Sequence, residues 1–373
     1  EADGAELVSE VGDILISATE ATTIDAKASA ASVSEAGGLV GLASSGAGAS
    51  ALNIILSSVQ SLVANASLIS AADARVLATN TATLNAVITS TSKAKAGGLI
   101  ADGSSIGKAL ARNFIGFDPV GFDASDKPSV FTAGFSNPNQ INKGDVVFLA
   151  EGSGIRSGEH YEYIGEDPIE KSDINGDETL DNLIFNQDYT DAAKWKHLLS
   201  LEDQIVVKAS VANSTVNTVA DLVVNATNSQ TIDSQVSAGS VALAAGFVAD
   251  AESGAGAGTV NRINAAVTAQ IDGQAATSGS DIVVGGNLAV TADETSLINA
   301  FSAASSVAVA KGLFADAAAT GIAGADSQIS GSSNASVNNV RIEVAGNANV
   351  DALQSATINA EANASAASNG ELA

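Results

Sequence analysis

The sequence predicts an all-β fold, a parallel β-solenoid (β-helix) built from repeats of roughly 60 residues and interrupted by one small inserted β-rich module. Three observations predict it: a motif that recurs at nearly constant spacing, an apolar pattern of period two, and one anomalous step whose composition differs from the rest. Hydrophobic residues make up 46% of the 373 residues but aromatic residues only 4%, which indicates a narrow core of aliphatic side chains.

A four-residue anchor motif establishes the repeat. The aliphatic residues of successive anchors are separated by 60, 148, 66 and 60 residues, at positions 24, 84, 232, 298 and 358. The five copies are Thr23-Ile24-Asp25-Ala26, Thr83-Leu84-Asn85-Ala86, Thr231-Ile232-Asp233-Ser234, Leu297-Ile298-Asn299-Ala300 and Thr357-Ile358-Asn359-Ala360. Only the second step departs from the repeat length.

Two other residue types keep phase with the anchor. Glycines recur as Gly38, Gly98, Gly246 and Gly312, where we expect turns with positive φ. Asparagines recur as Asn53, Asn113 and Asn261, each followed two places later by isoleucine. These asparagines predict either a ladder of side-chain amides between successive coils or ordinary turn chemistry.

The apolar pattern within a repeat has the period of β-strands. In Leu288-Ala289-Val290-Thr291-Ala292 alternate residues suit a core, and the phase switches later in the repeat, as in Val241-Leu243-Ala245. The switch predicts short strands separated by turns, with roughly three coils of about 20 residues in each repeat. Stacked units of this kind bury an inner face that one unit cannot bury alone.

The anomalous step marks an insertion, because a spacing of 148 exceeds the repeat of 60 by 88 residues. We predict three regions: a first solenoid part at 1–115, the insert at 116–204 and a second solenoid part at 205–373. From Phe114 onward, the insert region holds all four Pro, all three Tyr, the only Trp, both His and seven of the ten Phe. It therefore has a core of its own, with strands expected at 146–149 and 161–164 and a short helix or turn at 188–195.

These motifs support a resemblance to the giant repetitive, adhesin-like surface exoproteins of bacteria. The repeats that end in Thr-Ile-Asp-Ala resemble those of such proteins, and so does the segment at 106–116. Within the insert, the segments at 144–147, 161–165 and 187–191, with Lys194-Trp195, are similar to a recurring motif of the same group. The resemblance implies an extracellular or cell-surface location and a structural or adhesive role, and it supplies no catalytic residues.

One acidic loop in the insert suggests a cation site. Calcium takes six to eight oxygen ligands, which a tight loop with oxygen-bearing residues at alternate positions can supply. A solvated acidic turn is the alternative, because Glu178 and Ile184 occupy the places where an EF-hand loop starting at Asp173 has Gly and Glu. The candidate ligands are Asp173, Asn175, Asp177, Thr179 and Asp181. Calcium is the only cofactor that we expect.

Composition excludes several classes of function. A formal net charge of −26 repels nucleic acid and anionic lipid, and no uninterrupted apolar stretch predicts insertion in a membrane. Cysteine is absent, so disulfides and thiolate metal sites are excluded. A polysaccharide-active β-helix enzyme needs clustered carboxylates with basic partners, whereas the basic residues here are scattered, so we expect no enzymatic activity.

Two hypotheses of function remain. In the first, the chain is a rigid stalk or fibre subunit that pairs end to end with copies of itself or with adjoining repeats, since both of its ends are expected to be uncapped coils. In the second, it is an adhesin whose insert binds a cell surface or a glycan through Tyr161, Tyr163 and Trp195. Exposed rings would favour binding, and buried rings would favour the structural role.

Overall fold

The computed structural model describes residues 2–117, 130–132, 138–148, 160–170, 184, 187, 189, 191, 193–197, 204–273 and 281–371. The chain divides into two compact units: a solenoid unit, Glu1–Phe117 with Gln204–Ala373, and an insert unit, Asp118–Asp203. These limits lie within two residues of the predicted boundaries. The described residues form strands, turns and bends and contain no helix, so none of them forms a helix able to span a membrane.

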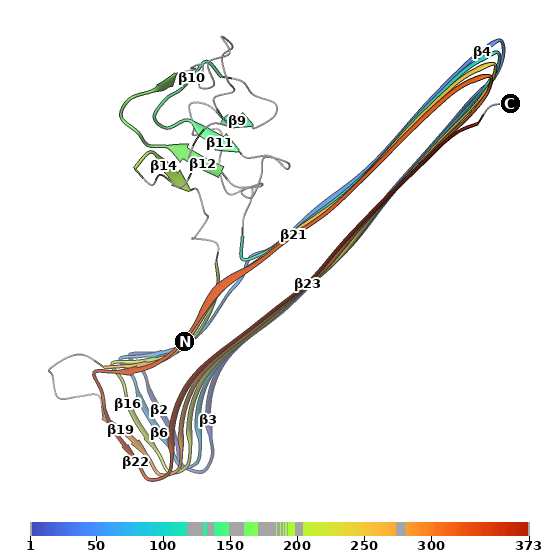
Figure 1. Ribbon diagram of the computed structural model, residues 1–373. Coiled ribbons are helices and arrows are strands. Elements are labelled where there is room, and N and C mark those ends of the chain that lie inside the picture. The colour runs from blue at the N-terminus through green and yellow to red at the C-terminus, as the bar shows by residue number, and fades with distance from the viewer. Residues whose placement is uncertain are drawn as a thin grey trace. The chain divides into compact units, whose positions relative to one another are not determined.

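The described part of the solenoid unit forms three parallel sheets (Figure 1). The anchor sheet carries the five anchor motifs and comprises β3 (Ile14–Ala36), β7 (Ala74–Gly97), β17 (Leu222–Ala245), β20 (Leu288–Lys311) and β23 (Ala348–Glu371). The opposite sheet comprises β1 (Ala2–Asp3), β4 (Val40–Ile55), β5 (Ser58–Ala64), β8 (Ile100–Ile115), β15 (Ile205–Ala212), β18 (Val248–Asp272) and β21 (Phe314–Asn338). The short sheet comprises β2 (Glu6–Ser9), β6 (Ser67–Ser70), β16 (Thr215–Thr218), β19 (Asp281–Val284) and β22 (Arg341–Val344).

Each repeat is a single coil, so the parallel solenoid is confirmed but its predicted division into three coils is wrong. Ile14 pairs with Ala74, one whole repeat further along the chain, and the register holds along 23 residues of β3. The phase switch is not a strand break. In the later part of β17, the inward positions are Ala242 and Ala244, while Val241 and Leu243 face outward. Bulky residues move to the outer face because the inner space narrows.

The core changes width along the coil. In its wide part, the buried side chains include Leu84, Ile115 and Ile232. In its narrow part, next to the turns between the long strands, all ten buried residues of the cluster are alanines. At Gly107 an added Cβ would lie 2.4 Å from the carbonyl oxygen of Gly239, which belongs to the other sheet. Small residues therefore let the two sheets approach each other closely.

The glycines of these turns serve mainly as points of close approach between coils. Only Gly38 has a positive φ, of 132°, so the predicted reason is wrong for the other three. A Cβ on Gly98, Gly246 or Gly312 would come within 2.3 to 2.6 Å of the carbonyl oxygen of the glycine in the preceding turn. Stacking of turn on turn therefore requires glycine at this position.

A second corner uses left-handed backbone that the sequence analysis missed. Asn65, Asn213 and Asn339 have φ of 51°, 50° and 52°, and Gly4 occupies the equivalent place in the first coil with φ of 60°. Asparagine and glycine tolerate this conformation better than other residues. Their shared phase, just after a strand of the opposite sheet, was the available signal.

The described residues of the insert unit form two small sheets. The first has the order β14 (Trp195–His197), β12 (His160–Tyr163), β11 (Val146–Phe148) and β9 (Val130–Thr132). The second pairs β10 (Gln140–Ile141) with β13 (Ile169–Glu170). The expected strands near 146 and 161 are confirmed as the antiparallel pair β11 and β12. Of the predicted helix or turn, the described part is a turn, in which Trp195 N donates to Asp191 O at 2.8 Å.

Candidate assembly surfaces

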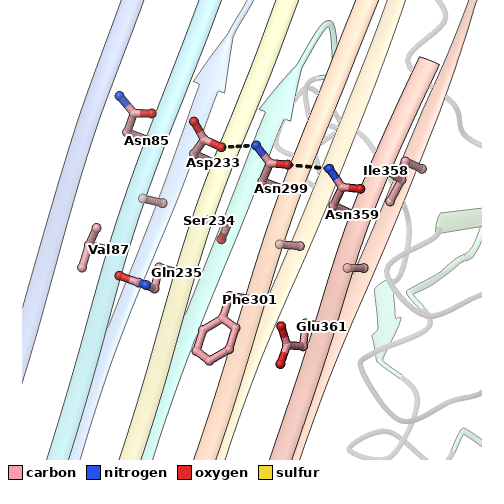
Figure 2. A pocket seen from close by; sticks show the side chains of 13 residues that line it. Asn85, Val87, Asp233, Ser234, Gln235, Asn299, Phe301, Ile358, Asn359 and Glu361 are labelled. Atoms are coloured by element: carbon pink, nitrogen blue, oxygen red, sulfur yellow. Dashed lines mark hydrogen bonds between the residues drawn. The ribbon is translucent and has the colours of Figure 1, made fainter. Parts of the chain in front are cut away.

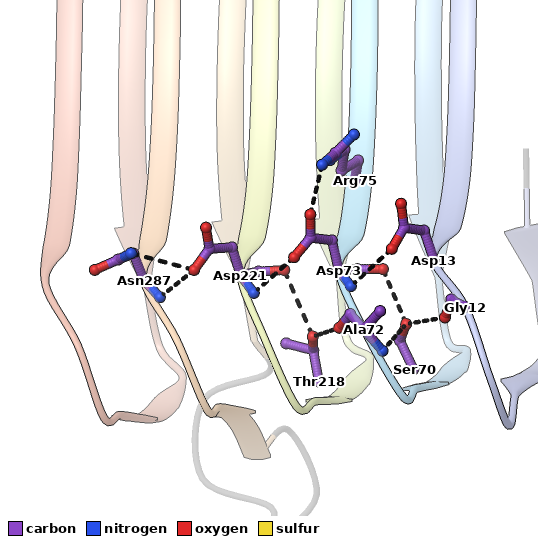
Figure 3. A network of polar contacts seen from close by, with 9 residues as sticks. All are labelled: Gly12, Asp13, Ser70, Ala72, Asp73, Arg75, Thr218, Asp221 and Asn287. Carbon is purple, nitrogen blue, oxygen red and sulfur yellow. Dashed lines mark hydrogen bonds and ion pairs between the residues drawn. The ribbon is translucent and has the colours of Figure 1, made fainter.

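A ladder of side chains joins the turns that precede the anchor sheet (Figure 3). The side-chain Oδ1 of one coil accepts the backbone N–H of the equivalent residue in the next coil. The four bonds run from Asp73 to Asp13 at 3.1 Å, Asp221 to Asp73 at 3.1 Å, Asn287 to Asp221 at 2.6 Å and Asn347 to Asn287 at 3.0 Å. The ladder has a direction, because every coil offers an oxygen to its successor.

The carboxylate of Asp73, in the middle of this ladder, is held in the charged form that accepts hydrogen bonds. The pKa of Asp73 lies below its ordinary value because the Asp221 backbone N–H bonds to it and the Arg75 guanidinium donates to it and attracts it. Ser70 adds a second contact between coils, since its hydroxyl donates to Gly12 O at 3.0 Å. The turn is thus bonded through both backbone and side chains.

A buried ladder of side-chain amides runs from coil to coil along the inner face of the opposite sheet. Asn53 Nδ2 donates to Asn113 Oδ1 at 2.9 Å, and Asn113 Nδ2 donates to Asn261 Oδ1 at 2.8 Å. Asn261 Nδ2 continues to Ser327 Oγ at 3.3 Å. The sequence left a ladder and ordinary turn chemistry open for these asparagines, and the structure shows the ladder.

A second column of polar side chains lies on the inner face of the anchor sheet, and it includes one buried carboxyl group. Glu294 is 1% exposed and lies in register between Asn228 and Gln354. Its Oε1 accepts from Ser296 Oγ at 3.1 Å, whereas its Oε2 and Asn228 Nδ2 are buried without a hydrogen-bond partner. Burial raises the pKa of Glu294, against the smaller effect of hydrogen bonds from Ser296 and Gln354.

The outer face of the anchor sheet carries an open groove of about 800 Å³ (Figure 2). Aspartate and asparagine share one column along it, and amides bond to their neighbours: Asn299 Nδ2 to Asp233 Oδ1 at 2.6 Å and Asn359 Nδ2 to Asn299 Oδ1 at 2.9 Å. Phe301 and Glu361 line the adjacent column. These polar groups bond from coil to coil, so the groove displays the same stacking chemistry as the turns.

The terminal coils leave their backbone edges open. β23 is the last strand of the anchor sheet, and all 24 of its residues are exposed, whereas every second residue of its neighbour β20 is buried. At the other end, the anchor sheet stops at β3. Both strands present unpaired hydrogen-bonding groups over their length, which is a template for a further strand.

The predicted site residues of the insert fall into two groups. Tyr161, Tyr163 and Trp195 are 1%, 3% and 3% exposed and belong to the core of the insert unit. The ring centroids of Tyr163 and Trp195 lie 5.2 Å apart, and those of Tyr189 and Trp195 lie 4.7 Å apart.

The candidate calcium ligands lie outside the described residues; they are Asp173, Asn175, Asp177, Thr179 and Asp181. Within the described ranges, no three His, Asp or Glu side chains are grouped as metal ligands.

Comparison of the chain with protein-family models, with curated proteins and with solved structures finds no match.

Proposed function

We propose that this chain is an extracellular structural protein, a rigid stalk or fibre subunit of a bacterial surface assembly that extends by stacking of coils end to end. The next coil belongs either to a longer form of the same chain or to a second copy. The observation that carries the proposal is the open edge of β23, whose 24 exposed residues continue a register that holds over four preceding strands.

The directional turn ladder supports the same proposal. Asn347 donates its backbone N–H to Asn287. By the periodicity of the ladder, the side-chain oxygen of Asn347 is the acceptor that a following coil would use. Asp13 begins the ladder, and its backbone N–H is the group that would meet such an oxygen. One end therefore offers the acceptor and the other end the donor, as head-to-tail growth requires.

The adhesin hypothesis receives no comparable support from the rings of the insert. Tyr161, Tyr163 and Trp195 pack against one another and against Ile141 and Val147, so their surfaces are used inside the unit. Burial of these rings is what the structural hypothesis expects. The absence of cysteine and the large negative charge suit a long extracellular polymer held by packing and hydrogen bonds.

Light scattering of the 373-residue chain against concentration tests the proposal. We expect an open-ended series of masses, and we expect Ile358→Lys to stop it, because Ile358 occupies an inward column in β23 where the next coil must pack. Thr357→Lys is the matched control, since the neighbouring side chain points to the other face and leaves this column intact.

Two results would overturn stacking. One is a wild-type chain that forms no species larger than a dimer at any concentration. The other is equal loss of assembly in both lysine variants, which would show that added charge, rather than the packing column, controls association. Melting curves of both variants check that the coils remain folded.

A further inference from the structure

The turns that join the anchor sheet to the opposite sheet lie at the far tips of the long strands (Figure 1). These turns carry an apolar ridge. Each of four successive coils contributes two large hydrophobic residues with exposed fractions between 41% and 77%. We call the following eight residues the turn ridge: Leu39, Val40, Leu99, Ile100, Phe247, Val248, Leu313 and Phe314. Turns usually carry polar residues, so two apolar residues in each coil require an explanation.

The backbone of the turn ridge repeats regularly from coil to coil. Backbone bonds tie each turn to the one before it, from Leu99 N to Leu39 O at 2.9 Å and from Phe247 N to Leu99 O at 2.9 Å. Phe314 N bonds to Phe247 O at 3.0 Å, and the rings of Phe247 and Phe314 meet edge to face with centroids 5.7 Å apart. The side chains therefore stand in two straight columns with the spacing of parallel strands.

The size of the ridge is that of a protein interface. Eight side chains at these exposures present roughly 700 Å² of apolar surface, which exceeds the ~300–600 Å² usual for the largest patch of a monomer. A standard interface buries ~800 Å² on each partner, so the turn ridge alone supplies most of one side. Hydrophobic surface of this extent indicates a contact with another protein surface.

Charged residues flank the ridge differently on its two sides. On the outer face of the anchor sheet, just before the turns, lie the exposed Lys93 and Lys95, and Lys311, which bonds to Glu371 at 3.1 Å. Glu35 is in register with Lys95 on the same side. On the outer face of the opposite sheet, just after the turns, three aspartates stand in one column: Asp102, Asp250 and Asp316.

We propose that the turn ridge binds the turn ridge of a second copy of this chain, about a twofold axis parallel to the direction in which the coils stack. This axis brings the lysine side of one copy beside the aspartate side of the other. Coils of both copies then rise in the same direction with the same spacing, so Lys95 of each copy lies at the level of Asp102 of the other. A twofold axis perpendicular to the sheets would instead place lysine beside lysine.

The aspartates of this column repel one another, and such a partner reduces the repulsion. Partial burial raises the pKa of Asp250, and the carboxylates of Asp102 and Asp316 on either side raise it further. Like charges in register are unfavourable on a sheet, and Lys95 of a second copy, at the level of Asp102, offsets one of the charges beside Asp250. The lateral contact differs from end-to-end stacking, since it uses side chains at the turns and forms a closed pair.

Sedimentation of the 373-residue chain in the Ile358→Lys background isolates this contact, because that change blocks open-ended growth but leaves the turns unaltered. We expect a dimer, and we expect Phe247→Ser with Phe314→Ser to weaken it by at least ~100-fold, since aromatic anchors carry most of an interface. Ile322→Ser is the control, because Ile322 is 67% exposed on the outer face of β21 away from the turns.

A charge swap tests the orientation of the two copies. We expect Lys95→Glu and Asp102→Lys each to weaken the dimer by about 10-fold, and the double variant to restore it. A monomer at all concentrations would overturn the proposal, and so would equal loss in the Ile322→Ser control. Failure of the swap to restore dimers would overturn the twofold axis. If the serine variants that keep Ile358 still form long assemblies, end-to-end stacking does not depend on the turn ridge. The two proposals can therefore be refuted independently of each other.

Discussion

The solenoid unit and the insert unit are stabilised in opposite ways. The solenoid distributes its stability over long parallel ladders, and its narrow core region is made of alanine. The insert has described strands of only two to four residues and concentrates its packing in Tyr161, Tyr163, Tyr189 and Trp195. The hydroxyl of Tyr189 bonds to Ile184 O at 2.7 Å, and burial raises its pKa. The stability of the solenoid unit therefore depends on the register of its strands, and the stability of the insert unit depends on a few aromatic rings.

The largest effect is expected when the insert is removed in two lengths, because the solenoid depends on register. Ile115 pairs with Ile263 and Ile205 pairs with Ala265, so only one residue, the equivalent of Asn264, belongs between the two halves of the interrupted strand. Deleting residues 117–204 leaves Gly116 in that place and should give a folded, β-rich solenoid. Deleting residues 116–204 shifts β15 by one residue, which turns its inward side chains outward.

Circular dichroism and thermal melting of the two deletions measure the effect. We expect cooperative melting for the first deletion and a large loss of stability for the second, although they differ by one residue. Equal behaviour of the two would contradict the register argument. Unfolding of both would show that the insert is part of the scaffold.

The next largest effect is expected in the insert. Tyr161→Ala removes a ring that is 1% exposed and should cost about 3–5 kcal/mol of local stability, as for other buried rings. Trp195, the only tryptophan, then reports exposure through its fluorescence. Hydrogen exchange in the anchor sheet should be unchanged. Loss of protection there would show that the two units do not unfold separately.

A smaller effect is expected where the two long sheets touch. Gly107→Ala places a Cβ 2.4 Å from Gly239 O and should destabilise the solenoid by about 1–3 kcal/mol through overpacking. Gly256→Ala is the matched control, because an added Cβ there meets nothing within 4 Å. Denaturant melts compare the two, and equal effects would mean that loss of glycine, rather than contact between the sheets, is responsible.

The smallest effect is a pH dependence from Glu294. Because its pKa is raised in the folded protein, the folded state keeps a proton that the unfolded chain has already released just above the ordinary glutamate value of 4.5. Stability should therefore fall as pH rises through this window and then level off. Glu294→Gln should remove that part of the fall. An unchanged slope in the variant would show that Glu294 ionises as it does in the unfolded chain.

Much of the architecture follows from spacing alone. Five anchors in phase predicted a parallel solenoid, and the excess of 88 residues placed the insert within two residues of the unit boundary. The asparagine positions also predicted the amide ladder, although turn chemistry remained an equal alternative. Periodicity reports these features because every coil repeats the same contacts, so one error in phase would disrupt all of them.

Other features depended on how the two long sheets approach each other. Spacing did not reveal that one repeat is one coil, because the apolar phase changes where the core narrows and Val241 and Leu243 turn outward. Nor did composition decide whether Tyr161, Tyr163 and Trp195 are buried or exposed, since an aromatic ring suits either a core or a binding surface. Repeat length, strand type and the place of the insert were thus determined by the sequence itself. Coil size, the faces of the strands near the turns and the burial of the rings were decided by the tertiary structure, because each depends on the distance between segments that are far apart in the chain.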